Sequence, residues 1–226
     1  MRTMKALLLA AVLVMSTSAA HAGTMTFGIN GDAAIPLGNL SKVPDASSTS
    51  TELQAGMKVS FGGGVYGDYW IKDDYAFGLD INGEFFSNKD DLFDAATKAA
   101  YPDIKFKATV MSFGAHGIWA PAMANAPAQP WITYGAGLYR INFKTEKAPA
   151  SFDIDKNLNK FGFNLGAGVD MKAGASMKVG AEVKYHYILS ALDPHDFDST
   201  VASDAKAANY VTAGIRLTFL TAGVTK

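Results

Sequence analysis

Hydrophobic and polar residues alternate with a period of two along most of the chain. Because successive side chains of a β-strand point to opposite faces, this pattern predicts strands with one apolar and one polar face. Turn-forming residues separate the alternating stretches. We expect eight strands, over residues 24–37, 56–71, 75–87, 107–120, 131–144, 160–171, 176–189 and 209–220. They cover about half of residues 23–226, which exceeds the strand content of ordinary globular domains.

The two faces of the predicted strands differ in charge. In the stretch 176–189, Val183 and Tyr185 share one face, whereas Glu182 and Lys184 share the other. Outside the stretch 131–144, the apolar face carries one charged residue, Lys107, at a strand end. An apolar outside and a polar inside are typical of transmembrane β-barrels. The opposite face therefore predicts a charge network in the lumen, made of Asp32, Lys58, Asp68, Asp80, Glu84, Asp170, Lys178, Glu182, Lys184, His186 and Arg216.

The stretch 131–144 departs from this rule. Its apolar residues occupy one face up to Leu138 and the other face from Tyr139 onward, while Arg140 and Lys144 take the first face. A β-bulge near Gly137 would turn both apolar sets outward. The alternative is that one half of the stretch faces inward, which would make the lumen locally aromatic.

Long and short connections alternate along the chain. The long loops are expected over residues 38–55, 88–106, 145–159 and 190–208, and the short turns over 72–74, 121–130 and 172–175. This order predicts an all-β, eight-stranded antiparallel up-and-down transmembrane β-barrel, with short turns and both termini in the periplasm and long loops outside. Prolines at 121, 127 and 130 argue against strand in the second turn. Residues 91–98 are expected to form one or two helical turns.

The pattern of the first residues predicts a targeting signal. Arg2 and Lys5 precede an apolar run over residues 6–15, and the small-residue site Ala20–His21–Ala22 follows. This order is typical of a secretory signal peptide, and the run is too short to cross a bilayer as a helix. We therefore expect a signal peptide over 1–22 and an outer-membrane barrel domain over 23–226.

Composition excludes several other classes of protein. The chain has no cysteine, which excludes disulfide scaffolds and thiolate metal sites. Its 20 basic and 21 acidic residues give no excess of positive charge for nucleic acid. No clustered histidines and carboxylates have metal-ligand spacing. The acidic stretch 193–198 is a weak calcium candidate, which solvated surface explains more simply. We expect no metal and no cofactor.

Aromatic residues flank the short turns. Tyr69 and Tyr75 lie beside the first turn, and Trp119 and Trp131 lie beside the second. Aromatic side chains are enriched at both interfaces of a bilayer. These four residues are therefore predicted to be interfacial.

With these features the chain resembles the small eight-stranded outer-membrane β-barrels of the OmpA and OmpX type over almost all of residues 23–226. The final strand is similar to the assembly signal of that family, with Gly214, Leu217 and Phe219 at the glycine, apolar and aromatic positions. One departure is that seven residues follow Phe219, whereas family members commonly end there. The resemblance implies outer-membrane lipids and the outer-membrane assembly machinery as partners.

Hairpin turns also predict which residues face each other in the lumen. A turn at 72–74 places Tyr66 opposite Asp80 and Gly62 opposite Glu84. A turn at 173–175 places Asp170 opposite Lys178, and Asn164 opposite Lys184. The near balance of charges favours a self-neutralising plug over a solute pathway, because buried charges persist when they are paired.

The sequence leaves three hypotheses for function. The first is a monomeric, non-enzymatic outer-membrane barrel with a plugged lumen, whose long loops bind an extracellular ligand. The second is a narrow channel for small or apolar solutes. The third is an enzyme that modifies lipid A, although His116 lies four residues from Ser112, about 13 Å along a strand. His195 and Ser199 do not match the pattern of the lipid A deacylases.

Overall fold

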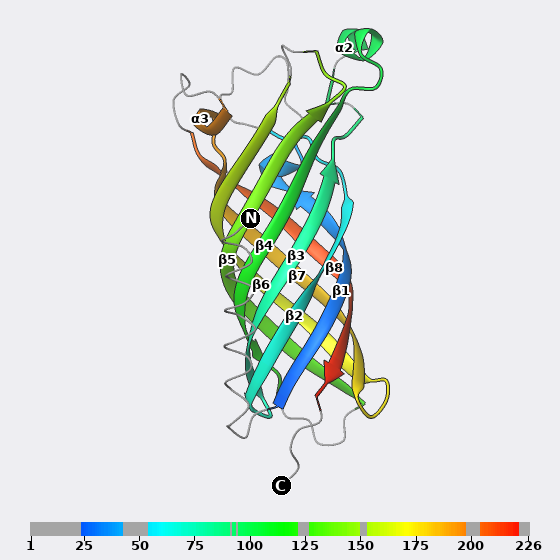
Figure 1. The fold of residues 1–226 in the computed structure, drawn as a ribbon, viewed down its shortest axis with the longest axis vertical. Coiled ribbons are helices and arrows are strands. Elements are labelled where there is room, and N and C mark those ends of the chain that lie inside the picture. The colour runs from blue at the N-terminus through cyan, green and yellow to red at the C-terminus, as the bar shows by residue number, and fades with distance from the viewer. Residues whose placement is uncertain are drawn as a thin grey trace.

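The structure is a computed structural model that describes residues 24–42, 54–90, 92–93, 95–121, 127–149, 153–197 and 204–221. Eight antiparallel strands form a closed barrel in sequence order, and β8 pairs with β1 (Figure 1). The predicted up-and-down barrel is therefore confirmed. The strands are β1 (Thr24–Leu37), β2 (Ser60–Lys72), β3 (Tyr75–Ser87), β4 (Lys105–Trp119), β5 (Ala128–Glu146), β6 (Asp155–Lys172), β7 (Met177–Leu192) and β8 (Lys206–Leu220). The predicted signal peptide lies outside the described residues.

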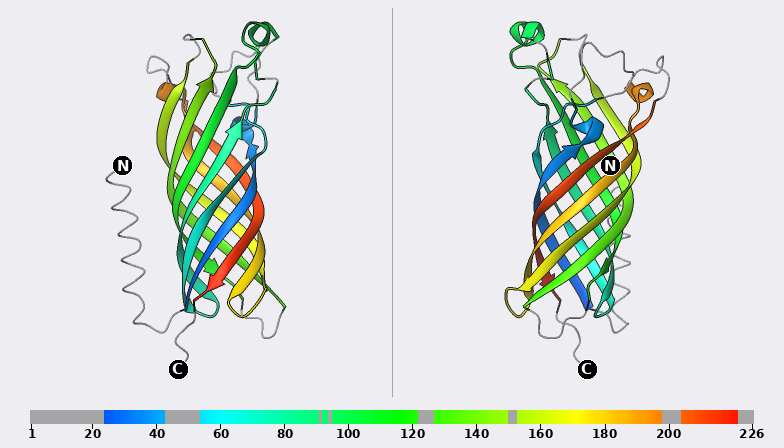
Figure 2. Two further views of the ribbon diagram at one scale, coloured as in Figure 1. Left: turned by 45° about the vertical axis from the view of Figure 1, so that its right-hand side comes forward. Right: turned by 180° about the vertical axis from the view of Figure 1, so that it is seen from behind.

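The two ends of the barrel differ. The start of β1, the end of β8 and the β2–β3 and β6–β7 turns lie at one end, which we call the turn end (Figures 1 and 2). The opposite end, the loop end, carries the 3-10 helix η2 (Gly38–Leu40) and the short helices α2 (Ala95–Ala100) and α3 (Pro194–Phe197). Helix α2 overlaps the predicted helical turns at 91–98. Among the described residues, no helix is long and apolar enough to cross a membrane.

Strand ends at the loop end differ from the predicted ends. Strands β4 to β7 extend beyond their predicted limits, so the loops after β5 and β7 are shorter than expected. Strand β2 begins at Ser60 and not at 56. At the turn end, β5 already begins at Ala128, so the prediction that Pro130 lies outside a strand is wrong. Pro130 pairs only with Val169 of β6, because pairing with β4 begins at Ile132, so its missing N–H is not needed.

Strand β5 is continuous through the point where its pattern changes. Gly137 pairs with Gly114 of β4 and with Gly162 of β6, and neither ladder has a register shift. The predicted β-bulge is therefore wrong. Instead Leu138 is 60% exposed on the outer face, while Tyr139 is 1% exposed inside the barrel. The locally aromatic lumen is the interpretation that the structure supports.

The two short hairpins test the predicted cross-strand pairs. In β2–β3, Tyr66 faces Asp80 and Gly62 faces Glu84, as predicted. In β6–β7, Asp170 faces Gly180 and not Lys178, and Asn164 faces His186 and not Lys184. The turn over residues 173–176 is longer than expected. The resulting shift is two residues, which leaves every side chain on its predicted face because the period of a strand is two.

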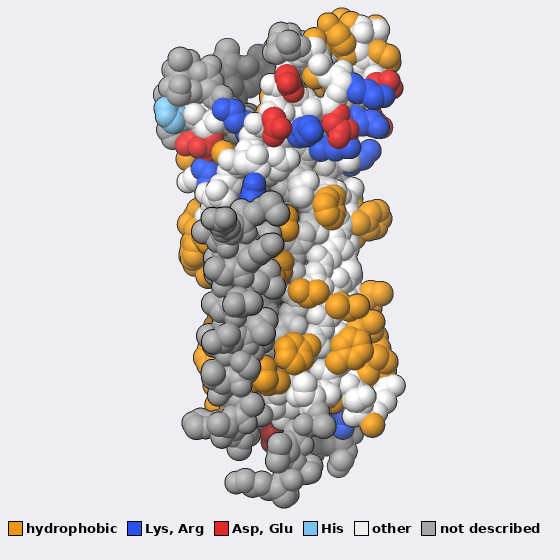
Figure 3. All heavy atoms as spheres, in the orientation of Figure 1, with side chains coloured by type: hydrophobic (Ala, Val, Ile, Leu, Met, Phe, Trp, Pro, Cys, Tyr) orange, Lys and Arg blue, Asp and Glu red, His pale blue; other side chains and the backbone are white. Residues whose placement is uncertain are grey.

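Apolar side chains cover the middle and turn-end part of the outer surface as a belt (Figure 3). Their exposure far exceeds the isolated apolar patches that soluble monomers show. The belt includes Phe27, Ile29, Phe61, Val65, Phe77, Leu79, Phe85, Leu138, Phe163, Leu165, Val183 and Ile215. A bilayer would cover such a surface.

Candidate functional site

The lumen is filled by three layers of side chains. A small apolar cluster, the lower cluster, lies near the turn end and consists of Ala76, Ile118, Ala120, Trp131 and the partly buried Trp70. Above it lies a charged layer, which consists of Arg216, His116 and the carboxylates that contact them, Asp68, Asp80, Asp170 and Glu182. A larger apolar cluster, the upper cluster, fills the loop end with Ala34, Leu40, Ala55, Met57, Phe86, Ala108, Val110, Tyr139, Ile141, Phe143, Leu158, Ile188, Ala191, Leu192, Ala208 and Tyr210.

Arg216 of β8 is the centre of the charged layer. Its guanidinium group lies 3.6 Å from Asp68, 3.6 Å from Asp170 and 3.7 Å from Glu182, so strands β2, β6 and β7 each supply a carboxylate. Nε also donates a hydrogen bond of 3.0 Å to the hydroxyl of Tyr66. A buried arginine is stable only when several partners compensate its lost hydration, and this one has them.

Two aromatic rings enclose the same guanidinium group. Its carbon lies 4.3 Å from the ring centre of Tyr66 and 4.5 Å from that of Trp131. A planar cation over an aromatic face gains electrostatic attraction, which is stronger when the cation is buried, as Arg216 is here. Trp131 therefore belongs to the lumen and is 4% exposed, so its predicted place among the interfacial aromatics is wrong.

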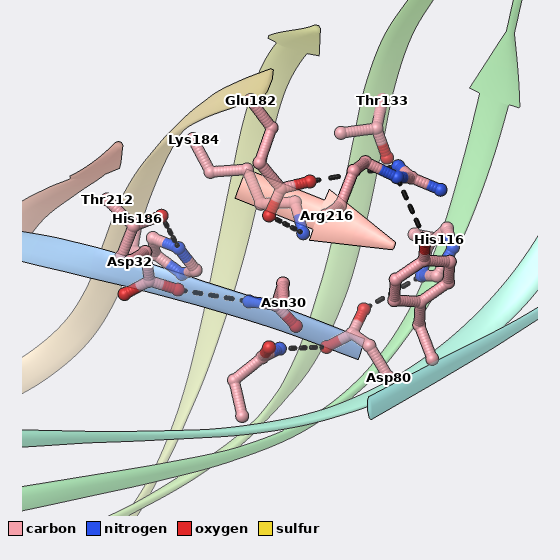
Figure 4. Close-up of polar contacts among 12 residues, drawn as sticks. Asn30, Asp32, Asp80, His116, Thr133, Glu182, Lys184, His186, Thr212 and Arg216 are labelled. Carbon is pink, nitrogen blue, oxygen red and sulfur yellow. Dashed lines mark hydrogen bonds and ion pairs between the residues drawn. The ribbon is translucent and has the colours of Figure 1, made fainter. Parts of the chain in front are cut away.

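His116 of β4 joins two carboxylates. Its Nε2 lies 2.8 Å from Asp68 and its Nδ1 lies 2.8 Å from Asp80. Asp68 contacts both His116 and Arg216, so the charged groups form one connected network. Asn82 donates a further hydrogen bond of 2.9 Å to Asp80. Figure 4 shows Asp80, His116 and Arg216 pointing toward one another from three different strands.

The remaining charged residues lie around this centre. Lys184 lies 3.5 Å from Glu182, and Asn30 donates a hydrogen bond of 3.0 Å to Asp32 (Figure 4). Lys178 donates to the side-chain oxygen of Gln129 at 3.0 Å and lies over Trp70.

A polar and aromatic group links the charged layer to the upper cluster. His186 stacks on Tyr210 with ring centres 4.4 Å apart, and the hydroxyl of Tyr139 lies 3.1 Å from its Nδ1. Tyr210 donates to Glu84 at 3.4 Å. The hydroxyls of Tyr139 and Tyr210 thus contact polar side chains of the lumen, while both residues belong to the upper cluster.

Glycine makes room for the network at one close approach. Gly78 of β3 lies directly against the side chains of Asp68 and His116, and a Cβ atom there would overlap both. A larger residue at this position would separate the two partners.

The structure places most of the predicted lumen residues inside the barrel, with one exception. Asp32, Asp68, Asp80, Glu84, Asp170, Glu182, His186 and Arg216 are buried there, and Lys178 and Lys184 are partly buried. Lys58 is exposed and precedes the first residue of β2, so its assignment to the network is wrong. Alternation alone does not mark where a strand begins, and β2 begins two residues after Lys58.

The other predicted residues lie on the outside or at the wall. Trp119 is 45% exposed, and the hydroxyls of Tyr75 and Tyr134 hydrogen-bond to each other on the outer surface. Tyr69 is half-buried. In the predicted assembly signal, Gly214 packs against Asp32, and Leu217 and Phe219 pair with Ile29 and Phe27 of β1.

The predicted charge network omits four residues of the lumen. Tyr66, His116, Tyr139 and Tyr210 all contact its members. The predicted turn at 72–74 already places Tyr66 opposite Asp80 in the lumen, and the phase of the strands places His116 and Tyr210 on the same inward face as predicted members. Among the described residues, no group of three or more histidines and carboxylates is arranged to hold a metal ion. Ser199 and Asp198 lie outside the described residues.

Comparison with known protein families agrees with the barrel architecture. A family model described as "Outer membrane protein beta-barrel domain" matches residues 7–219. The chain belongs to this family of outer-membrane β-barrels. It is therefore a protein of the bacterial outer membrane, and the apolar belt of this barrel faces lipid. No curated protein matches the chain in sequence.

Solved structures of small barrels are similar in fold to this outer-membrane barrel. Ail, the attachment invasion locus protein of Yersinia pestis, is 11% identical with a TM-score of 0.49, and the alignment covers 89% of this chain and 100% of Ail. The N-terminal β-barrel domain of OprF from Pseudomonas aeruginosa is 12% identical with a TM-score of 0.48, and the alignment covers 88% of this chain and 99% of that domain.

Proposed function

We propose that this protein is a non-enzymatic integral outer-membrane barrel, whose lumen is a self-neutralised plug and whose long loops face outward and carry its interactions. The observation that carries the proposal is the layering of the lumen. An apolar cluster lies on each side of the charged layer. A hydrated ion entering from either end would have to shed water against apolar side chains, which costs several kcal/mol or more.

The state of the charges also supports a plug. Asp68, Asp170 and Glu182 surround Arg216, and His116 lies between two carboxylates. Charged groups that hold one another in fixed positions are poor relay points for a moving ion. An eight-stranded barrel is also just wide enough for side chains to fill.

Single-channel recording in planar lipid bilayers tests the plug. We expect no reproducible openings from the purified protein across a wide range of voltage. A sixteen-stranded porin inserted in the same way is the positive control, since its lumen holds water. Regular openings of this barrel would contradict the proposal and favour a narrow channel.

The geometry of the histidines supports the absence of hydrolytic chemistry. A histidine that activates a serine needs one free ring nitrogen for the hydroxyl proton. Both nitrogens of His116 contact carboxylates, while the Oγ atom of Ser112 is buried without a hydrogen-bond partner among the described residues. His186 is buried between Tyr139 and Thr212. Mass spectrometry of lipid A from cells with and without the protein tests this point, and altered acylation would contradict it.

A further inference from the structure

A basic pocket lies on the loop-end half of the barrel, where the segment from Asn88 to Ile104 meets the end of β3 and the start of β4. Its volume is about 580 Å³. Four lysines line it, and Asp90 is the one carboxylate among the described lining residues. The lysines are Lys58, Lys98, Lys105 and Lys107, and they come from the residues before β2, from α2 and from β4.

The lysines of this pocket form one close ion pair with the described residues, and the charge of Lys105 also acts on Asp103 and on Glu146, which faces it across the β4–β5 ladder. Lys107 lies 2.7 Å from Glu146. Within the described part of the chain, no ion pair closer than 4.0 Å involves Lys58, Lys98 or Lys105. Three separate segments thus bring positive charges to one concave surface, and like charges repel each other. An anion in the pocket would remove that cost.

Two exposed aromatic side chains lie directly below the pocket. Phe61 and Phe85 are paired across β2 and β3 and are 76% and 64% exposed on the outer face. Phe85 also faces Thr109 of β4, and the next row of the same face pairs Ser87 with Lys107. The two rows are about 7 Å apart along the strands. Figure 3 shows basic side chains, with acidic ones among them, at the loop end directly above the apolar belt.

We propose that this pocket binds the phosphorylated headgroup of an outer-leaflet lipid, with the acyl chains lying over Phe61 and Phe85. Ammonium groups form charge-assisted hydrogen bonds with phosphate oxygens. The aromatic pair below supplies an apolar surface at the depth where acyl chains begin. A phosphorylated lipid fits both parts of the site, whereas a soluble sugar phosphate fits only the lysines. The inference uses the outward orientation of the loops and is independent of the lumen plug.

Native mass spectrometry of the folded full-length protein in detergent tests the lysines, with diphosphoryl lipid A as the probe. Changing Lys58, Lys98, Lys105 and Lys107 together to Gln should weaken binding at least about tenfold. The matched control changes four other loop-end lysines to Gln, namely Lys42, Lys147, Lys156 and Lys206, and should weaken binding less than about twofold. The electrophoretic shift between unheated and heated samples verifies that each variant is folded. Equal losses in the two variants would overturn the site.

Two further measurements test the lipid part. Phe85→Ala should weaken binding of lipid A about threefold, whereas Leu165→Ala, which removes a similarly exposed apolar side chain from β6, should leave it unchanged. Lipid A without phosphates and glucose 1-phosphate should each bind at least about tenfold more weakly than diphosphoryl lipid A. If glucose 1-phosphate bound as tightly, the occupant would be a soluble sugar phosphate and the lipid proposal would be wrong.

Discussion

Toward the turn end, β5 carries its apolar side chains on the outside of the barrel, whereas toward the loop end it carries them on the inside. Leu138 is the last outward apolar residue, and from Tyr139 onward the large apolar side chains point inward; before that point only Trp131 is a large inward apolar side chain among the described residues of β5. The neighbouring strands change with it. Phe113 on β4 and Phe161 on β6 both face outward beside Leu138, whereas Thr109 and Asn157 face outward beside Asn142.

This reversal identifies the medium outside the wall. An outward side chain is stable when it is apolar beside hydrocarbon and polar beside water. A strand that stays continuous while its polarity reverses has therefore left the bilayer. The part of the barrel outside the bilayer needs an apolar core, as a soluble barrel does. The upper cluster is that core. The inside of the turn-end half is held by charge pairing, and the inside of the loop-end half by close packing.

The largest effect should come from removing the cation at the centre of the charged layer. Arg216→Met leaves Asp68, Asp170 and Glu182 without their shared partner, and breaking a buried ion pair costs about 3–5 kcal/mol. Arg140→Met is the matched control on the outer face of the loop-end half, where the change should cost less than about 0.5 kcal/mol. Urea unfolding of the barrel in detergent micelles measures both. Similar stability of the two variants would mean that the charged layer does not hold the turn-end half together.

The next effect separates packing in the loop-end half from contact with lipid in the turn-end half. Phe143 is 1% exposed within the upper cluster, whereas Phe163 is 47% exposed in the apolar belt. Phe143→Ala should destabilise the barrel by about 3 kcal/mol, because it leaves a cavity. Phe163→Ala should cost about 1 kcal/mol or less, since lipid can fill the vacated space. The same urea titration measures both changes, and a larger cost at Phe163 would contradict an apolar core in the loop-end half.

A third pair tests where the hydrocarbon ends. Leu165 and Asn157 lie on the same outward face of β6, eight residues apart. Leu165→Arg places a charge near the middle of the belt and should cost about 2–4 kcal/mol, whereas Asn157→Arg lies above the belt and should cost about 0–1 kcal/mol. Folding into phospholipid vesicles followed by urea unfolding measures the difference. An equal cost at both positions would place the edge of the bilayer beyond Asn157.

The sequence was sufficient to predict the eight strands and the two faces of the wall, because alternation depends only on the direction of side chains. It did not predict the β6–β7 register, since moving a strand by two residues leaves the alternation unchanged. Lys58 shows another limit. It has the right phase for the lumen, but it precedes β2, and strand ends are not fixed by alternation.

The aromatic half of β5 shows why one rule for the whole strand was not enough. The predicted bulge followed from assuming that lipid surrounds the full length of every strand. Lipid does not surround the loop-end half of β5. There Tyr139, Ile141 and Phe143 are buried inside, while Arg140 and Lys144 are exposed outside. The contacts of His116 with Asp68 and Asp80 also depend on how three strands are registered, which a single sequence does not specify.

The smallest effect is expected on the outer face of the loop-end half, where charges meet water. Lys107 and Glu146 lie 2.7 Å apart, with side chains 43% and 39% exposed. Exposed ion pairs contribute between about 0 and 1 kcal/mol, and salt screens them. Glu146→Gln should therefore change the free energy of unfolding by less than about 1 kcal/mol at low salt, and by less still at about 1 M salt.

Glu182→Gln, which removes a partner of Arg216 inside the turn-end half, should cost more than Glu146→Gln and should respond less to salt, because buried pairs are screened less. Urea titrations of both variants at the two salt concentrations make the comparison. Equal salt dependence at the two positions would mean that water reaches the charged layer, and the lumen would then not be closed by its apolar clusters.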